Sequence, residues 1–334
     1  MATLSGKYTL LDVAKTLDPD GSTAAVAELL SQDNEMLMDM PWFEGNLPTG
    51  HRITTRTGLP DVIFRKLNGG VPPSKATTAQ LDEACGILEA RSEIDKDLAM
   101  LNGNTGAFRL LQAKAFIEAM NQRMQQTVLY GSTETTPEAF LGLAPRYGFA
   151  PSNASAAPNK VNVIDAGGTG SNNTSIWLVG WGANTVHGIY PKGSQAGLIH
   201  NDLGEGDAFD VNQNRFRAFM DQYQWKCGIA LHDWRYVVRI ANVDVTALTK
   251  NASAGADLID LMTQALEKIH SLSGVTPAFY VNRTIRSFLR RQNVNKVASG
   301  TLMYDEVAGK PALRFGEVPV RRVDALGIAE ARIV

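Results

Sequence analysis

The chain has 334 residues, of which 44% are hydrophobic and 20% charged, and its formal net charge is −2. This apolar fraction excludes a wholly disordered chain, and the near-zero charge argues against a protein that mainly coats nucleic acid. No apolar run reaches the roughly 18 residues of a membrane-spanning helix, and the N-terminus lacks the layout of a signal peptide. The two cysteines, Cys85 and Cys227, are too few for a disulfide scaffold, so we expect a soluble globular protein made inside the cell.

The N-terminal part predicts a helix and then an extended excursion. The helix is expected to run from a cap at 21–23 to just before Pro41, because proline ends helices. Beyond it, β-forming residues favour two short strands, 53–57 and 62–67, joined by a turn at 58–61. A lone hairpin is marginal in water, so we expect this excursion to lie against something else, with a neighbouring subunit as the natural candidate.

The excursion and the residues that follow it carry opposite charges. The basic residues of the excursion are Arg52, Arg56, Arg65, Lys66 and Lys75. The acidic residues that follow are Asp82, Glu83, Glu89, Glu93, Asp95 and Asp97. This pattern fits a basic arm that docks on an acidic strip of an adjacent copy, and it also fits two ordinary solvated faces.

A long helix is predicted over 105–130. Apolar residues recur there at helical spacing, no proline interrupts the run, and Gly131 suits the C-terminal cap. The apolar stripe consists of Phe108, Leu111, Ala115, Ala119, Met120, Met124 and Val128. At 1.5 Å per residue the helix would be about 39 Å long, so we expect it to be a structural spine.

Beyond this helix, strands and helices mix without βαβ regularity, which predicts an α+β fold. The expected strands are 160–164, 176–179, 236–240 continuing as 243–246, and 318–323. The expected helices are 257–272 and a second one that starts after a cap at Asn282 and covers 283–292. The run 176–179 is continuously apolar, as a strand buried on both faces would be.

No pattern identifies a catalytic site. The glycines at 167–170 lack the Gly-Lys-Ser/Thr ending of a phosphate-binding loop. The serine within 193–197 directly follows the first glycine, so the segment is not a nucleophile elbow. We therefore expect no catalytic residue and no cofactor.

Metal ligands are not spaced as in familiar metal sites. The histidines are His51, His187, His200, His232 and His270, and no two form a His-x-x-x-His pair. The acidic loop of Asp202, Glu205, Asp207 and Asp210 lacks the register of a calcium loop. We expect no metal site, and the absence of a catalytic constellation favours an assembly protein. A metal-dependent hydrolase built on His200, Asp202, His232 and Asp233 stays open as an alternative of another class.

An ordered series of short motifs carries a family resemblance. The motifs are Leu10-Leu11-Asp12-Val13-Ala14-Lys15, Pro41-Trp42-Phe43-Glu44-Gly45-Asn46, Phe140-Leu141-Gly142-Leu143, residues 181–193 (WGANTVHGIYPKG) and residues 315–324 (FGEVPVRRVD). Taken in this order around the long helix, they make the chain resemble the major capsid proteins of tailed bacteriophages with the Hong Kong 97-type fold. Within that fold the chain is similar to the epsilon-fifteen-like podovirus group, over nearly its whole length.

The resemblance implies a division of the chain into the parts of such a capsid protein. These are an N-terminal arm over 1–44, an extended loop over 45–80, a peripheral domain over 81–135 with the spine helix 105–130, and an axial domain over 136–334. Long strands around 216–246 would return from the axial to the peripheral domain. The lysine and asparagine that cross-link the prototype's shell do not align here, so we expect no cross-link.

The resemblance also implies function and partners. Copies would assemble as hexamers and pentamers into an icosahedral shell around double-stranded DNA, which they would contact nonspecifically. Expected further partners are a separate scaffolding protein, a portal and a decoration protein, with no membrane involved. The protein would be made in the bacterial host cytoplasm and end in the virion capsid. Two alternative interpretations are a cellular nanocompartment shell of the same fold and a phage tail or baseplate component.

Overall fold

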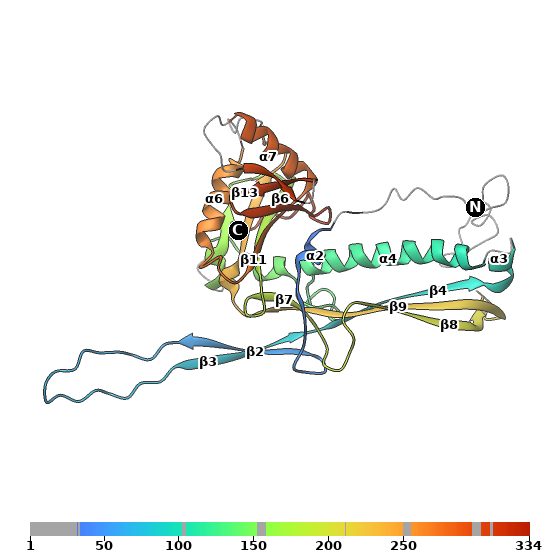
Figure 1. Cartoon of the computed structure of the whole chain (residues 1–334), viewed down its shortest axis with the longest axis horizontal. Helices are drawn as coiled ribbons and strands as arrows, with labels where there is room; N and C mark the ends of the chain where they lie inside the picture. The colour runs from blue at the N-terminus through green and yellow to red at the C-terminus, as the bar shows by residue number, and fades with distance from the viewer. Residues whose placement is uncertain are drawn as a thin grey trace.

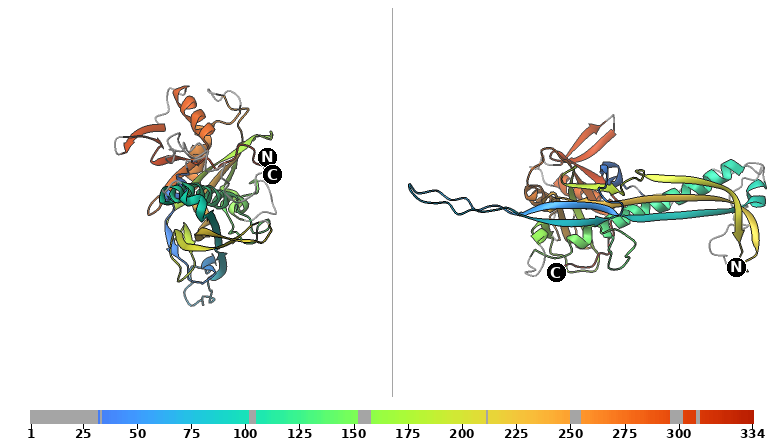
Figure 2. Two further views of the ribbon diagram at one scale, coloured as in Figure 1. Left: turned by 90° about the vertical axis from the view of Figure 1, so that its right-hand side faces the viewer. Right: turned by 90° about the horizontal axis from the view of Figure 1, so that it is seen from below.

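The structure is a computed structural model and describes residues 32, 34–101, 105–151, 158–210, 212–249, 255–295, 302–307 and 310–334. A compact body carries two long extensions that leave it in opposite directions (Figure 1). We call one extension the limb; it contains α4 (Thr105–Tyr130), β4 (Gly86–Asp95), β8 (Leu198–Phe209) and β9 (Arg215–Leu231). The other is a thin hairpin of residues 50–84. Seen from below, limb, body and hairpin lie nearly in one line (Figure 2).

The body is built on a mixed sheet. Its strands in spatial order are β5 (Val163–Asp165), β10 (Val237–Asp244), β6 (Asn173–Trp181), β11 (Thr276–Val281), β14 (Val318–Arg322), β13 (Lys310–Phe315) and β12 (Leu302–Val307). Strand β6 also meets β7 (Val186–Tyr190), which pairs with β1 (Trp42–Glu44) and with β9. Because β9 goes on to pair with β4 and β8, this strand joins the body to the limb.

Strand β6 is buried on both faces, as its apolar run predicts. Side chains alternate across a strand, so Ile176 and Leu178 face one core while Trp177, Val179 and Trp181 face another. The first core lies under α6 (Leu258–Lys268) and α7 (Arg283–Asn295). The second lies under the C-terminal end of α4 and the short helix α5 (Leu143–Arg146).

The expected helices of the body are confirmed with small changes of boundary. Helix α6 begins after Asp257, whose side chain accepts the backbone N–H of Asp260. Helix α7 begins after Asn282, whose side chain accepts the backbone N–H of Thr284 at 2.9 Å. These short polar side chains satisfy N–H groups that have no partner inside the helix. The interrupted strand 236–246 is the single strand β10, in which Asn242 has φ 56° at an irregularity of the ladder.

The spine helix is confirmed over Thr105–Tyr130, but its apolar stripe is only partly buried. Met124 and Val128 lie in the second core, whereas Ala115 and Ala119 are exposed. The reason is the geometry of the limb, where the helix has left the body and packs on one side only, against strands and the short helix α3 (Lys96–Met100). There Phe116 of the helix stacks on a β9 side chain, with 5.7 Å between ring centroids.

One expected strand is wrong, another begins later than expected, and most of one expected helix is not tested. Residues 62–67 form no strand, because β2 (Gly50–Gly58) pairs instead with β3 (Thr77–Ala84). Residues 158–162 form a 3-10 turn, and the strand expected at 160–164 begins only at Val163. Most of the helix expected over 21–40 lies outside the described residues, whose first helix is α2 (Met36–Asp39). Among the described helices, including the short α3 (Lys96–Met100), none is long and apolar enough to cross a membrane.

Candidate assembly surfaces

The hairpin is a two-stranded ribbon with almost no core of its own. Its strands pair from Gly50 opposite Ala84 to Gly58 opposite Thr77. The connecting residues 59–76 form no helix or strand. At the root the inward-facing Ile53 is buried, but most other residues of both strands are exposed. A ribbon this long and bare is far less stable alone than a packed sheet.

The tip of the hairpin carries large apolar side chains that are exposed to solvent. Val62, Phe64 and Leu67 are 90%, 105% and 95% exposed. Leu59 and Val71 are also exposed. Scattered exposed apolar residues are normal, but several gathered on one projecting tip mark an interaction surface.

The basic residues predicted for the extended loop lie along the hairpin. Arg52 pairs within the hairpin with Asp82, Nε to Oδ1 at 2.6 Å, and this guanidinium holds the pKa of Asp82 below its ordinary value. The others have no ion pair within the part of the chain that the structure describes; they are Arg56, Arg65, Lys66 and Lys75. These four cations near the apolar tip are therefore available to a partner.

The predicted acidic strip is divided between the hairpin and the limb. Asp82 and Glu83 lie on β3, and Glu83 makes a buried two-point ion pair with Arg146 of α5, at 2.5 and 2.7 Å. Glu89, Glu93 and Asp95 lie on β4 and Asp97 in α3. Glu89 pairs with Arg91, and the side chain of Asp95 caps α3. Arg52, Asp82 and Glu83 thus have partners inside the chain, and the contact between basic and acidic sets of different copies stays a prediction.

The residues of the alternative hydrolase site are not brought together. His200 lies on β8, with Nε2 2.9 Å from Oδ1 of Asp221. It lies opposite Tyr223 of β9, whereas His232 follows the end of that strand, about 30 Å away at 3.4 Å per residue. Asp233 pairs with the neighbouring Arg235. No shared reaction centre can form across such a distance.

The acidic residues considered for calcium lie on β8, or in the case of Asp210 in the turn after it, and their carboxylates are already engaged. Asp202 binds Arg109 at 2.9 Å, and Glu205 binds Lys96 at 2.8 Å. Asp207 binds Arg217 at 3.1 Å. These pairs tie β8 to β9, α3 and α4, so the acidic residues hold the limb together.

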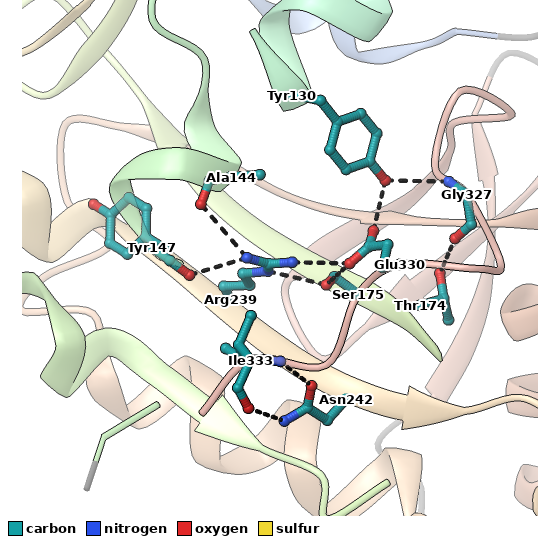
Figure 3. Close-up of polar contacts among 10 residues, drawn as sticks. All are labelled: Tyr130, Ala144, Tyr147, Thr174, Ser175, Arg239, Asn242, Gly327, Glu330 and Ile333. Carbon is teal, nitrogen blue, oxygen red and sulfur yellow. Dashed lines mark hydrogen bonds and ion pairs between the residues drawn. The ribbon is translucent and has the colours of Figure 1, made fainter. Parts of the chain in front are cut away.

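A buried polar cluster binds the C-terminal segment around Glu330 to the body (Figure 3). Glu330 accepts hydrogen bonds from Arg239 at 2.8 Å, from the Tyr130 hydroxyl at 2.5 Å and from the Ser175 hydroxyl at 2.5 Å. Arg239 also donates to the backbone carbonyl of Tyr147 at 3.0 Å. Burial, with the Glu330 carboxylate beside it, raises the pKa of Tyr130, so the phenol remains a proton donor.

Sequence reasoning missed two clusters because their members are far apart in the chain. Arg239 and Glu330 are separated by 91 residues. His51, His187 and His232 converge at the root of the hairpin although their spacing resembles no metal motif. No local signal in the sequence links either set.

The chain matches the family model "Major capsid protein GP7" over residues 18–334. The chain belongs to this family of major capsid proteins. A solved structure of bacteriophage Epsilon15 contains a chain that is 31% identical, with a TM-score of 0.78; the match covers 100% of this chain and 99% of that one. The bacteriophage JBD30 capsid shares the fold at 10% identity and a TM-score of 0.51, covering 89% and 92%. No curated protein matches.

Membership of this family gives the role of the chain as a whole. The major capsid protein forms the shell of the virion and has a structural role. The α+β fold with a long spine helix and an extended hairpin is the phage capsid fold. A metal-dependent hydrolase, a nanocompartment shell and a tail or baseplate component are not favoured. The exposed hairpin and limb are therefore parts of a protein that assembles with copies of itself.

Proposed function

We propose that copies of this chain form hexamers and pentamers that close into an icosahedral shell, with each hairpin laid over a neighbouring copy. The observation that carries the proposal is the tip, where Val62, Phe64 and Leu67 are almost fully exposed. Burying apolar surface is the main favourable term in protein association. Contacts of this kind, repeated around a closed shell, stabilise it far beyond any one of them.

The four cations near the tip support the same arrangement. Arg56, Arg65, Lys66 and Lys75 have no ion pair within the described chain, and acidic residues line β4 and α3 of the limb. Complementary charge of this kind selects the partner and its register more than it adds affinity. The acidic surface that receives the tip would be the limb of an adjacent copy, around Glu93 and Asp97.

The segments of the chain would then take the parts of a capsid subunit. We assign 1–44 to the N-terminal arm, 45–80 to the extended loop and 81–135 to the peripheral domain. The axial domain would occupy 136–334, apart from β8 and β9, which run out along the limb. The return strand of the loop continues to Ala84, past the end expected from sequence.

Other partners follow from this role. A scaffolding protein, a portal and a decoration protein would join the shell, and packaged double-stranded DNA would be contacted without sequence preference. The protein would be synthesised and assembled in the cytoplasm of a bacterial host.

The experiment that tests the proposal replaces Val62 and Phe64 with serine. Because one hot-spot side chain contributes about 2 kcal/mol, loss of a single one should raise the protein concentration needed for assembly about 30-fold, and the double variant should raise it further. The melting temperature of the unassembled subunit should not change, because both side chains project into solvent. Assembly is measured by light scattering and negative-stain electron microscopy.

Met38→Ser with Leu110→Ser is the control, since it removes large apolar side chains that are 86% and 60% exposed outside the hairpin. Normal shells from the tip variant, at the protein concentration at which the wild type assembles, would contradict the proposal. An equal loss from both variants would show that the tip has no special role.

A further inference from the structure

Three histidines from separate strands meet where the hairpin joins the body. His51 lies on β2, His187 lies on β7, and His232 directly follows β9. One candidate ligand atom of each lies within 4.8 Å of the other two. The body holds its two histidines firmly, because β7 is paired with β9 and the backbone N–H of His232 donates to the Thr185 carbonyl at 2.8 Å.

The spacing of the rings is close to that around a tetrahedral metal ion. The ring centroids are 5.0 Å apart for His187 and His232, 5.4 Å for His51 and His232, and 6.0 Å for His51 and His187. With metal–nitrogen bonds of about 2.0–2.1 Å, each ring centroid lies about 3.2 Å from the ion, which puts the centroids of tetrahedral ligands about 5 Å apart. Side-chain rotations that move the nitrogens by about 1 Å would complete the coordination.

The cluster holds buried nitrogen atoms with no other partner. His187 is only 3% exposed, and its Nδ1 has no hydrogen-bond partner among the described residues. The same is true of Nε2 of His232 within the described chain. His51 Nδ1 accepts the Asn46 N–H at a long 3.3 Å, a hydrogen bond that metal binding would replace.

The donor set selects the class of metal. The three candidate ligand atoms are imidazole nitrogens, which bind a metal ion in the neutral form of the ring. The Glu83 carboxylate acts on His232 electrostatically, but both its oxygens are bound by Arg146. Three imidazoles without a free carboxylate suit zinc, cobalt, nickel or copper and not magnesium or calcium.

We propose that His51, His187 and His232 bind one divalent transition metal ion of the zinc class, with solvent in the fourth position. The ion joins the first strand of the hairpin to β7 and to the end of β9, so it fixes the direction in which the hairpin leaves the body. Metal binding is a property of the single chain and goes beyond the shell-forming role.

The test is a titration of the purified full chain, stripped of metal, with Co²⁺ and then Zn²⁺. One Co²⁺ per chain should bind at micromolar concentration or tighter, give the strong visible absorption of tetrahedral cobalt, and be displaced by Zn²⁺. His51→Gln and His232→Gln should each weaken binding by at least the 10- to 100-fold that loss of an outer-shell partner of a metal ligand costs. Circular dichroism establishes that both variants fold.

His200→Gln and His270→Gln are the controls, because these histidines lie outside the cluster. Binding that is weaker than millimolar, that lacks the tetrahedral absorption, or that falls equally in the controls would overturn the proposal. Hydrogen exchange adds a second measurement: Zn²⁺ should slow exchange at the root of β2 in the wild type and not in His51→Gln. A shell that still forms after metal removal leaves the shell-forming role intact, so the two proposals fail separately.

Discussion

At the scale of single residues, Glu330 holds two strands of the body and the C-terminal end of α4 together. Its carboxylate binds Arg239 of β10, Tyr130 at the end of α4 and Ser175 of β6. Its backbone N–H also donates to the Asn173 carbonyl at 2.9 Å. A buried ion pair stabilises a fold only when all its partners are in place. Loss of one charge leaves the other buried without a counter-charge, which is strongly destabilising.

Glu330→Gln should therefore destabilise the subunit by about 3 kcal/mol, because the Arg239 guanidinium would keep its burial and lose its counter-charge. Chemical denaturation of the unassembled subunit measures this. The control is Glu317→Gln, a change at an exposed glutamate, which should have little effect. If the two variants unfold at the same denaturant concentration, the cluster does not carry the stability that its geometry suggests.

At the scale of elements, the hairpin is attached to the body by contacts at its root. Glu83 and Arg146 form a buried ion pair, whereas the adjacent Asp82 pairs with Arg52 in solvent. The two residues are consecutive on β3, so their side chains point to opposite faces, and the carboxylate of Glu83 is buried while that of Asp82 is exposed. Buried pairs leave a large penalty when broken, while exposed pairs are screened by water and salt.

The matched variants Glu83→Gln and Asp82→Asn should consequently behave differently. Glu83→Gln should loosen the root by about 3 kcal/mol, which speeds hydrogen exchange of the β2 and β3 amides there by about 100-fold. Asp82→Asn should change exchange little. Equal exchange rates in the two variants would contradict the anchoring role of the buried pair.

Sequence periodicity predicted those elements well that pack against other parts of the same chain. The helix 105–130 and the buried strand at 176–179 are both present, because helical and extended periods leave local signatures. The strand at 62–67 failed because its apolar residues face no core of this chain. The polar strand Thr77–Ala84, which has no such signature, pairs with β2 in its place.

The candidate sites were less predictable than the elements. The basic residues of the hairpin could be found from the sequence, but their partners could not. Arg52 pairs with Asp82 on the opposite strand, and the sequence does not determine which residues of the two strands face each other. His51, His187 and His232 come together only through the crossing of β2, β7 and β9. Convergence of this kind is set by tertiary packing, which short-range patterns do not encode.

At the scale of the whole molecule, the hairpin and the limb project in opposite directions from one body (Figure 1). A projecting basic hairpin and a limb with acidic residues give each copy two complementary ends. Charge complementarity between such ends acts over about 8–10 Å at physiological salt and weakens as salt rises. Shell closure should accordingly depend on the sign of the hairpin's charge.

Arg56→Glu with Arg65→Glu should impair shell closure at physiological salt, and added salt should partly restore it as the new repulsion is screened. Electron microscopy over a salt series shows the result. Lys114→Glu with Lys192→Glu makes the same change in net charge at exposed sites off the hairpin and should assemble more nearly as wild type. Normal shells from the hairpin variant would refute the charge contact.

The shared strand β9 also determines how a subunit responds to mechanical load. Its 17 residues, about 58 Å when extended, run without a break from the limb into the body, with β4 and β8 hydrogen-bonded along its two edges. A pull along the limb strains many of these hydrogen bonds in parallel, as in a lap joint under shear. A force that lifts the hairpin opens the bonds at its root one after another, as in peeling. Under outward pressure a subunit would therefore yield at the hairpin root while the limb stays stiff.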